Sequence, residues 1–87
     1  MVGIVTCVGS EPLEVLALAP DESRLTVYDQ NHFLTYARLI DAERGGVNWH
    51  KAASEILFCD VERDPAGSRR CWESHLARAR WIVNGSP

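Results

Sequence analysis

The sequence lacks the features that define a membrane protein, a disulfide-rich protein or one of the common enzyme classes. No apolar run approaches the ~18 residues that a membrane-spanning helix needs, and residues 1–5 carry no positive segment typical of a signal peptide. The three cysteines form no Cys-x-x-Cys pair, which favours reduced thiols and a cytoplasmic protein. Glycine-rich phosphate loops and the His-Glu-x-x-His and Gly-x-Ser-x-Gly motifs are also missing. We therefore expect no enzymatic activity, no cofactor and no small-molecule substrate.

The length and charge of the chain further restrict the class of protein to which it can belong. With 87 residues, 46% of them hydrophobic, the chain has the profile of one small domain spanning residues 1–87. Twelve acidic residues against nine basic ones give a net charge of −3, whereas a free-standing DNA-binding domain is usually basic. Residues 1–60 carry nine acids and four bases, a net −5, and residues 61–87 carry three acids and five arginines, a net +2. An anionic body thus precedes a cationic last third.

The first third of the chain predicts a small β element. Residues 2–8 and 13–19 are apolar runs rich in β-branched residues, and residues 24–28 form a third short candidate strand. The stretches between them, residues 9–12 and 20–23, have the composition of turns. We expect an α+β fold that is mainly helical, with the β element in residues 1–28 and a three-helix helix-turn-helix variant in residues 29–85.

From Asp29 onward the apolar residues recur at the helical period. The first helix is expected to follow a cap at Asp29 or Asn31 and to end at Gly45 and Gly46. Its predicted apolar stripe consists of Phe33, Leu34, Ala37, Ile40 and, at the flank, Tyr36. The second helix, residues 49–58, is expected to follow the N-cap Asn48. Its predicted inward stripe consists of Trp49, Ala52, Ala53, Ile56 and Leu57.

The third and longest helix is expected to begin at Asp64 and Pro65, an N-cap followed by a first-turn proline, and to end near Asn84. On a helical wheel its core stripe consists of Trp72, Leu76, Ala79 and Val83, widened by Cys71, His75 and Ile82. The opposite side consists of Arg70, Ser74, Ala77 and Trp81, with Arg69, Glu73 and Arg80 at its flanks. Arg69 and Glu73 are four residues apart and are expected to form a weak local ion pair.

Trp81 is the unusual residue of that outward side, because it is a large apolar side chain among polar ones. One reading is that it packs on the predicted N-terminal strands, and another is that it is exposed as an anchor for a partner protein, since Trp and Arg are frequent at interface hot spots. The third is that it is a surface tryptophan that the fold tolerates. For protein binding, the predicted contact residues are Arg70, Glu73, Ala77 and Trp81. The alternative is DNA binding by residue types that contact phosphates and base edges, namely Arg69, Arg70, Ser74, Arg78 and Arg80.

Cysteine and histidine could also suggest a metal site. Cys71 and His75 are four residues apart on the third helix, and Cys59 and His50 could join them around zinc. Because no Cys-x-x-Cys spacing supports such a site, we expect a buried thiol and a buried histidine instead, and no bound metal. A Cys/His nucleophile pair has equally little support.

Three stretches carry a family resemblance. Residues 28–43, 48–57 and 69–81 resemble the first, second and third helices of the RovC-like transcription-factor DNA-binding domains. The likeness covers roughly residues 25–85, and the closing element that the family places after the final glycine is not seen here. It implies a regulator of transcription, since some members bind DNA as activators. Small stand-alone members resemble antiactivators of conjugative-element transfer.

The implied role is the inhibition of a transcription activator by direct binding. The resemblance points to a LuxR-type quorum-sensing regulator or an activator with the same domain type as the partner. An acidic, short domain suits protein binding better than independent DNA binding. DNA binding is therefore the less favoured alternative, and no membrane partner is expected.

Overall fold

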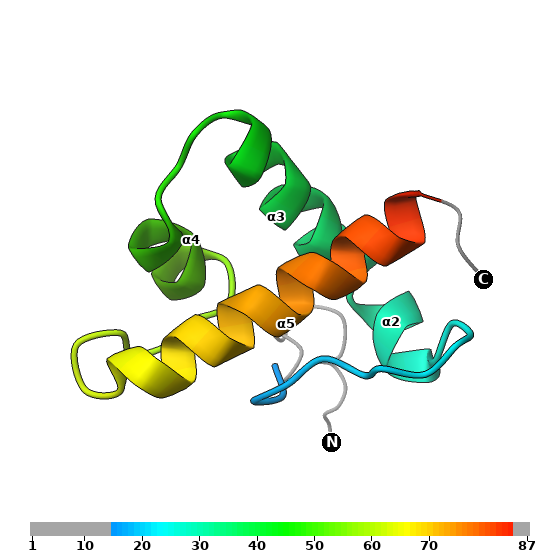
Figure 1. Ribbon diagram of the computed structural model, residues 1–87, viewed down its shortest axis with the longest axis horizontal. Helices are drawn as coiled ribbons and strands as arrows, with labels where there is room; N and C mark the ends of the chain where they lie inside the picture. Colours follow the sequence, from blue (N-terminus) through cyan, green and yellow to red (C-terminus); the bar gives the residue numbers. More distant parts are fainter. Residues whose placement is uncertain (1–14, 85–87) are drawn as a thin grey trace, which may run out of the picture.

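The regular secondary structure of residues 15–84, which are the residues that the computed structural model describes, is entirely helical. The helices are α2 (Val27–Asn31), α3 (Phe33–Arg44), α4 (Trp49–Glu55) and α5 (Pro65–Val83). α5 runs across the molecule, with α3 and α4 on one side and with α2 and the extended segment before it on the other (Figure 1). α5 contacts both α3 and α4, and α2 contacts α3. None of these helices combines the length and the apolar character needed to cross a membrane.

The predicted α+β fold class is wrong for the described part of the chain, because residues 15–84 contain no strand. The candidate strand at residues 24–28 is instead a helix start. Thr26 caps α2, and its hydroxyl accepts a hydrogen bond from the backbone N–H of Asp29 (3.1 Å). Asp29 in turn accepts one from the backbone N–H of Thr26 (2.8 Å), so this reciprocal capping box outweighs the β-branched composition. The candidate strand at residues 2–8 lies outside the described residues, as do the first two residues of the run at 13–19.

Helices are present in all three predicted stretches, and three of the predicted local signals are confirmed. Asn48 caps α4 by accepting from the N–H of Lys51 (3.0 Å), and Asp64 caps α5 by accepting from the N–H of Gly67 (3.0 Å). α3 ends at Gly45, and Gly46 adopts a positive φ of 76°, which glycine tolerates without strain. The first helix differs from the prediction at its start, because α3 begins after His32, and Asp29 lies inside α2.

The core forms where α3, α4 and α5 meet. It consists of Tyr36, Leu39, Ile40, Ala52, Leu57, Cys71, Leu76 and Ala79. Most of the predicted inward stripes of α4 and α5 are thus confirmed, but Trp49 of α4 is only partly buried and lies outside this core. Three predicted core positions of α3 are exposed instead, namely Phe33, Leu34 and Ala37, as is Val83 near the end of α5. The buried stripe of α3 is rotated toward Tyr36 and Leu39, which face α5.

Candidate functional site

One face of α5 remains open to solvent, and we call it the outer face. It consists of Arg69, Arg70, Glu73, Ala77 and Arg80, which are all exposed and follow one another at intervals of one to four residues. Three of the four predicted partner-binding residues, Arg70, Glu73 and Ala77, therefore share one accessible surface. The structure keeps them together because the opposite face of α5 is filled by the core.

Trp81, the fourth predicted partner-binding residue, is only partly exposed. Its ring packs on the guanidinium of Arg78, with 4.2 Å between the Cζ atom and the ring centroid. This cation–π contact explains a large aromatic residue at a position that the helical period places away from the core. Trp81 thus covers a buried charge and still contributes accessible ring surface.

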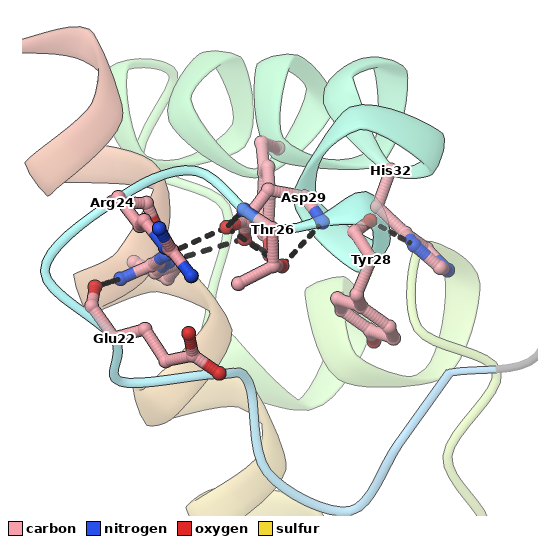
Figure 2. A network of polar contacts seen from close by, with 8 residues as sticks. Glu22, Arg24, Thr26, Tyr28, Asp29 and His32 are labelled. Atoms are coloured by element: carbon pink, nitrogen blue, oxygen red, sulfur yellow. Dashed lines mark hydrogen bonds and ion pairs between the residues drawn. The ribbon is translucent and has the colours of Figure 1, made fainter.

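Arg78, one of the predicted DNA-contacting residues, is buried, with 6% of its surface exposed. Its Nε and Nη2 atoms donate to the two carboxylate oxygens of Asp29 (3.1 and 2.6 Å), which is fully buried. The remaining N–H groups donate to the backbone carbonyls of Glu22 (2.5 Å) and Arg24 (2.8 Å). The segment that carries Glu22 and Arg24 bends around this site before it enters α2 at Thr26 (Figure 2). Arg78 therefore fastens the extended segment and α2 to α5.

The carboxylate of Asp29 stays ionised in this network. Burial by itself would raise the pKa of Asp29, but the hydrogen bonds from Arg78, Thr26 and Tyr36 outweigh it and hold the pKa well below its ordinary value. Tyr36 donates its hydroxyl proton to Oδ1 of Asp29 (2.8 Å), and burial and this bond raise the pKa of Tyr36. The hydrogen bond to Asp29 likewise raises the pKa of Arg78. Arg78 and Asp29 thus form a buried ion pair that remains charged and has a structural role.

The other predicted DNA-contacting residues are mostly engaged as well. Arg69 pairs with Glu73 (2.9 Å) and lies over the rings of Trp49 and Trp72, 5.1 and 5.3 Å from their centroids. Arg80 forms an ion pair with Glu43 of α3.

Ser74 and Arg70 are the remaining predicted DNA-contacting residues. Ser74 accepts a hydrogen bond from the backbone N–H of Ala19 (3.0 Å) and donates one to the carbonyl of Cys71 (3.1 Å). Among the arginines of the outer face, only Arg70 has no hydrogen bond or ion pair with another described residue.

A second network of hydrogen bonds joins residues 16–19 to α5. Because the carbonyl of Cys71 can only accept, the Nδ1 atom of His75 donates to it (2.7 Å), which leaves Nε2 to accept from the hydroxyl of Tyr28 (2.7 Å). That hydroxyl accepts in turn from the backbone N–H of Leu16 (3.1 Å). Burial lowers the pKa of His75, so the ring is neutral in the folded protein.

The buried neutral His75 predicts a loss of stability in mild acid. Its pKa in the folded state lies below the ordinary 6.5, so the unfolded chain takes up the proton first as the pH falls. We expect the free energy of unfolding to be constant above about pH 7 and to decrease progressively below about pH 6.5. Urea unfolding between pH 7.5 and pH 5 measures this. His75→Gln should remove most of the decrease, and a wild type of constant stability over this range would contradict the prediction.

A groove opens beside the outer face at the N-terminal half of α5. It has a volume of about 620 Å³ and lies between residues 15–18, residues 57–60 and α5. Leu16, Leu18 and Phe58 line it and are 47%, 57% and 67% exposed. Arg70 lines it as well, so the groove and the outer face share a residue. No pattern in the sequence indicates this groove, because residues far apart in the chain form its walls.

The cysteine and histidine pattern does not gather into a metal-ligand cluster among residues 15–84, where no three such side chains come together. Cys71 is buried, and burial together with the neighbouring Cys59 thiol raises the pKa of Cys71 to about 12. Its thiol also donates to the carbonyl of Leu16 (3.5 Å). A thiol held protonated in this way is a poor nucleophile, and its observed role is packing.

Comparisons with known proteins add no family assignment, since no family model matches the chain and a search of curated proteins finds no match. The likeness to the RovC-like domains rests on residues 28–43, 48–57 and 69–81 alone and stays a prediction.

Proposed function

We propose that this chain is a non-enzymatic antiactivator of the cytoplasm, which binds a transcription activator and prevents it from acting. The outer face of α5 would dock on the activator where the activator otherwise meets DNA, polymerase or its own dimer partner. The family resemblance suggests a LuxR-type quorum-sensing regulator or a same-family activator of conjugative transfer as the target. No cofactor and no substrate enter this mechanism.

The observation that carries the proposal is the state of the arginines on α5. Arg78 is buried in an ion pair, while Arg69 and Arg80 are paired with Glu73 and Glu43. Only Arg70 offers a guanidinium that no other described residue engages. DNA binding depends on several cations that neutralise phosphates, so this surface suits it poorly. A mixed face with an acid, an alanine and the edge of Trp81 suits a protein partner better.

Ala77→Glu is the sharpest test of the face. Ala77 is exposed in the middle of the outer face, so a bulky charged side chain there should block docking without disturbing the core. We expect at least a tenfold loss of affinity for the activator, about 1.4 kcal/mol. Calorimetric titration of the purified protein into candidate LuxR-type and same-family activators measures it. Ala77 is preferred to Trp81 because removing Trp81 would also uncover Arg78.

The matched control is Ala37→Glu, the same substitution at an exposed alanine of α3. It should change the affinity less than twofold. Equal losses in the two variants would remove the outer face from the interface, and the absence of binding to any activator would contradict the antiactivator role. A gel shift at low salt with promoter DNA tests the alternative, because a salt-sensitive complex lost in Arg70→Gln would favour DNA binding.

A further inference from the structure

Phe58 occupies a backbone conformation that its side chain does not favour. It follows the end of α4, where the backbone N–H of Cys59 donates to the carbonyl of Ala53 (3.0 Å) and closes the turn. Phe58 has a φ of 59° there. Glycine is the usual residue at this position of a helix end, and bulky residues rarely adopt positive φ.

The core does not explain the phenylalanine either. Its side chain is 67% exposed and is not part of the core cluster. A strained residue that neither the backbone nor the packing requires points to a function outside folding. Aromatic side chains exposed beside a hollow are typical anchors for a partner.

The surroundings of Phe58 define what would bind. Leu16 and Leu18 supply the other exposed apolar side chains of the groove, so its occupant must be apolar. Two acids also line the groove, but the carboxylate of Asp64 caps α5 and that of Asp60 accepts from the backbone N–H of Arg63 (3.2 Å). The only base among the lining residues is Arg70, whose guanidinium no other described residue engages. A guanidinium at the edge of an apolar groove is complementary to a carboxylate.

We propose that the groove between residues 15–18, residues 57–60 and α5 binds an apolar segment of the activator that carries an acidic residue beside its apolar side chains. Phe58, Leu16 and Leu18 contact the apolar side chains, and Arg70 pairs with the carboxylate. The inference rests on the proposed function and specifies its interface, since Arg70 belongs both to the groove and to the outer face.

The first test uses the isotope-labelled full chain and three short synthetic peptides. The peptides share the same leucines in a background of alanine and serine, and a pair of residues beside the leucines is glutamate, glutamine or lysine. We expect the amide signals of residues 57–60 and 67–71 to shift in a saturable way, with the glutamate peptide binding at least about tenfold more tightly than the lysine peptide. Arg70→Gln should abolish this preference. Equal binding of the three peptides, or a preference for lysine, would overturn the proposal.

Phe58→Gly separates binding from folding. Glycine suits the positive φ, so the variant should unfold at the same urea concentration as the wild type or a higher one. Its affinity for the glutamate peptide should nevertheless fall by at least about tenfold. An unchanged affinity would overturn the proposal. If the chain's own residues 2–8 filled the groove instead, the peptide would bind only after Ile4→Asp, and that result would also overturn it.

Inhibition of the activator distinguishes the two proposals. If the wild type inhibits and Phe58→Gly inhibits equally well, the groove is not the docking site and the antiactivator role stands. If the wild type inhibits and Phe58→Gly does not, both proposals are supported. If the wild type inhibits no activator, the antiactivator role fails, and the peptide comparison still decides what the groove binds.

Discussion

Replacing Arg78 by methionine is expected to lower the free energy of unfolding by about 3–5 kcal/mol. Methionine keeps much of the length of the side chain but leaves the fully buried carboxylate of Asp29 without its counterion. The carbonyls of Glu22 and Arg24 lose their donors in the same step. Small domains are stable by only about 5–15 kcal/mol, so the variant should be close to unfolding at room temperature. Urea unfolding followed by circular dichroism measures the change.

The matched control is Arg70→Met, which makes the same substitution on the same helix at an arginine that is exposed to solvent. It should change stability by less than about 0.5 kcal/mol. The double variant Asp29→Asn, Arg78→Met should be less destabilised than the sum of its single changes, because it no longer buries an unpaired charge. A loss below about 1 kcal/mol in Arg78→Met would show that the ion pair is dispensable.

Leu39→Ala is expected to have the second largest effect, a loss of about 3 kcal/mol in the free energy of unfolding. Leu39 is 1% exposed and lies in the core cluster between α3 and α5, so its removal leaves a cavity. Leu34→Ala on the same helix is the matched control. Leu34 is 66% exposed, and its loss should cost less than about 0.5 kcal/mol. Thermal and urea unfolding compare the two, and similar losses would contradict the observed orientation of α3.

These two leucines also show what the sequence can and cannot predict. The helical period identified α3 correctly, but it could not decide between two neighbouring apolar stripes, one through Leu34 and one through Leu39. That choice depends on where α5 lies, which is tertiary information. The starts of α4 and α5 and the end of α3 were predictable, because the signals at Asn48, Asp64 and Gly45 act through hydrogen bonds to residues three or four positions away.

The incorrect β element has a local cause. Thr26 and Asp29 have the spacing of a capping box, but the apolar and β-branched residues around them favoured a strand. The role of Arg78 was not accessible in the same way. Its partner Asp29 is 49 residues away, and nothing in the period of α5 distinguishes an arginine that faces solvent from one that binds a buried carboxylate.

The groove could not be predicted from the sequence either, because the position of Phe58 in it depends on the backbone φ of that residue. Phe58 was predicted to be the last residue of the second helix, whereas α4 ends at Glu55 and Phe58 turns into a positive φ. A phenylalanine gives no sequence signal for that conformation, because glycine is the residue expected there.

The contacts of Arg78 also have a kinetic consequence. They join residues that are 49, 54 and 56 positions apart, so they form only after most of the chain has been brought together. Closing such long loops costs entropy before any bond is gained, and it slows folding relative to a bundle held by neighbouring helices alone. We therefore expect the segment that carries Glu22 and Arg24 to dock onto α5 late in folding. On this expectation, the guanidinium of Arg78 stays hydrated until that segment docks, and the ion pair with Asp29 forms only then.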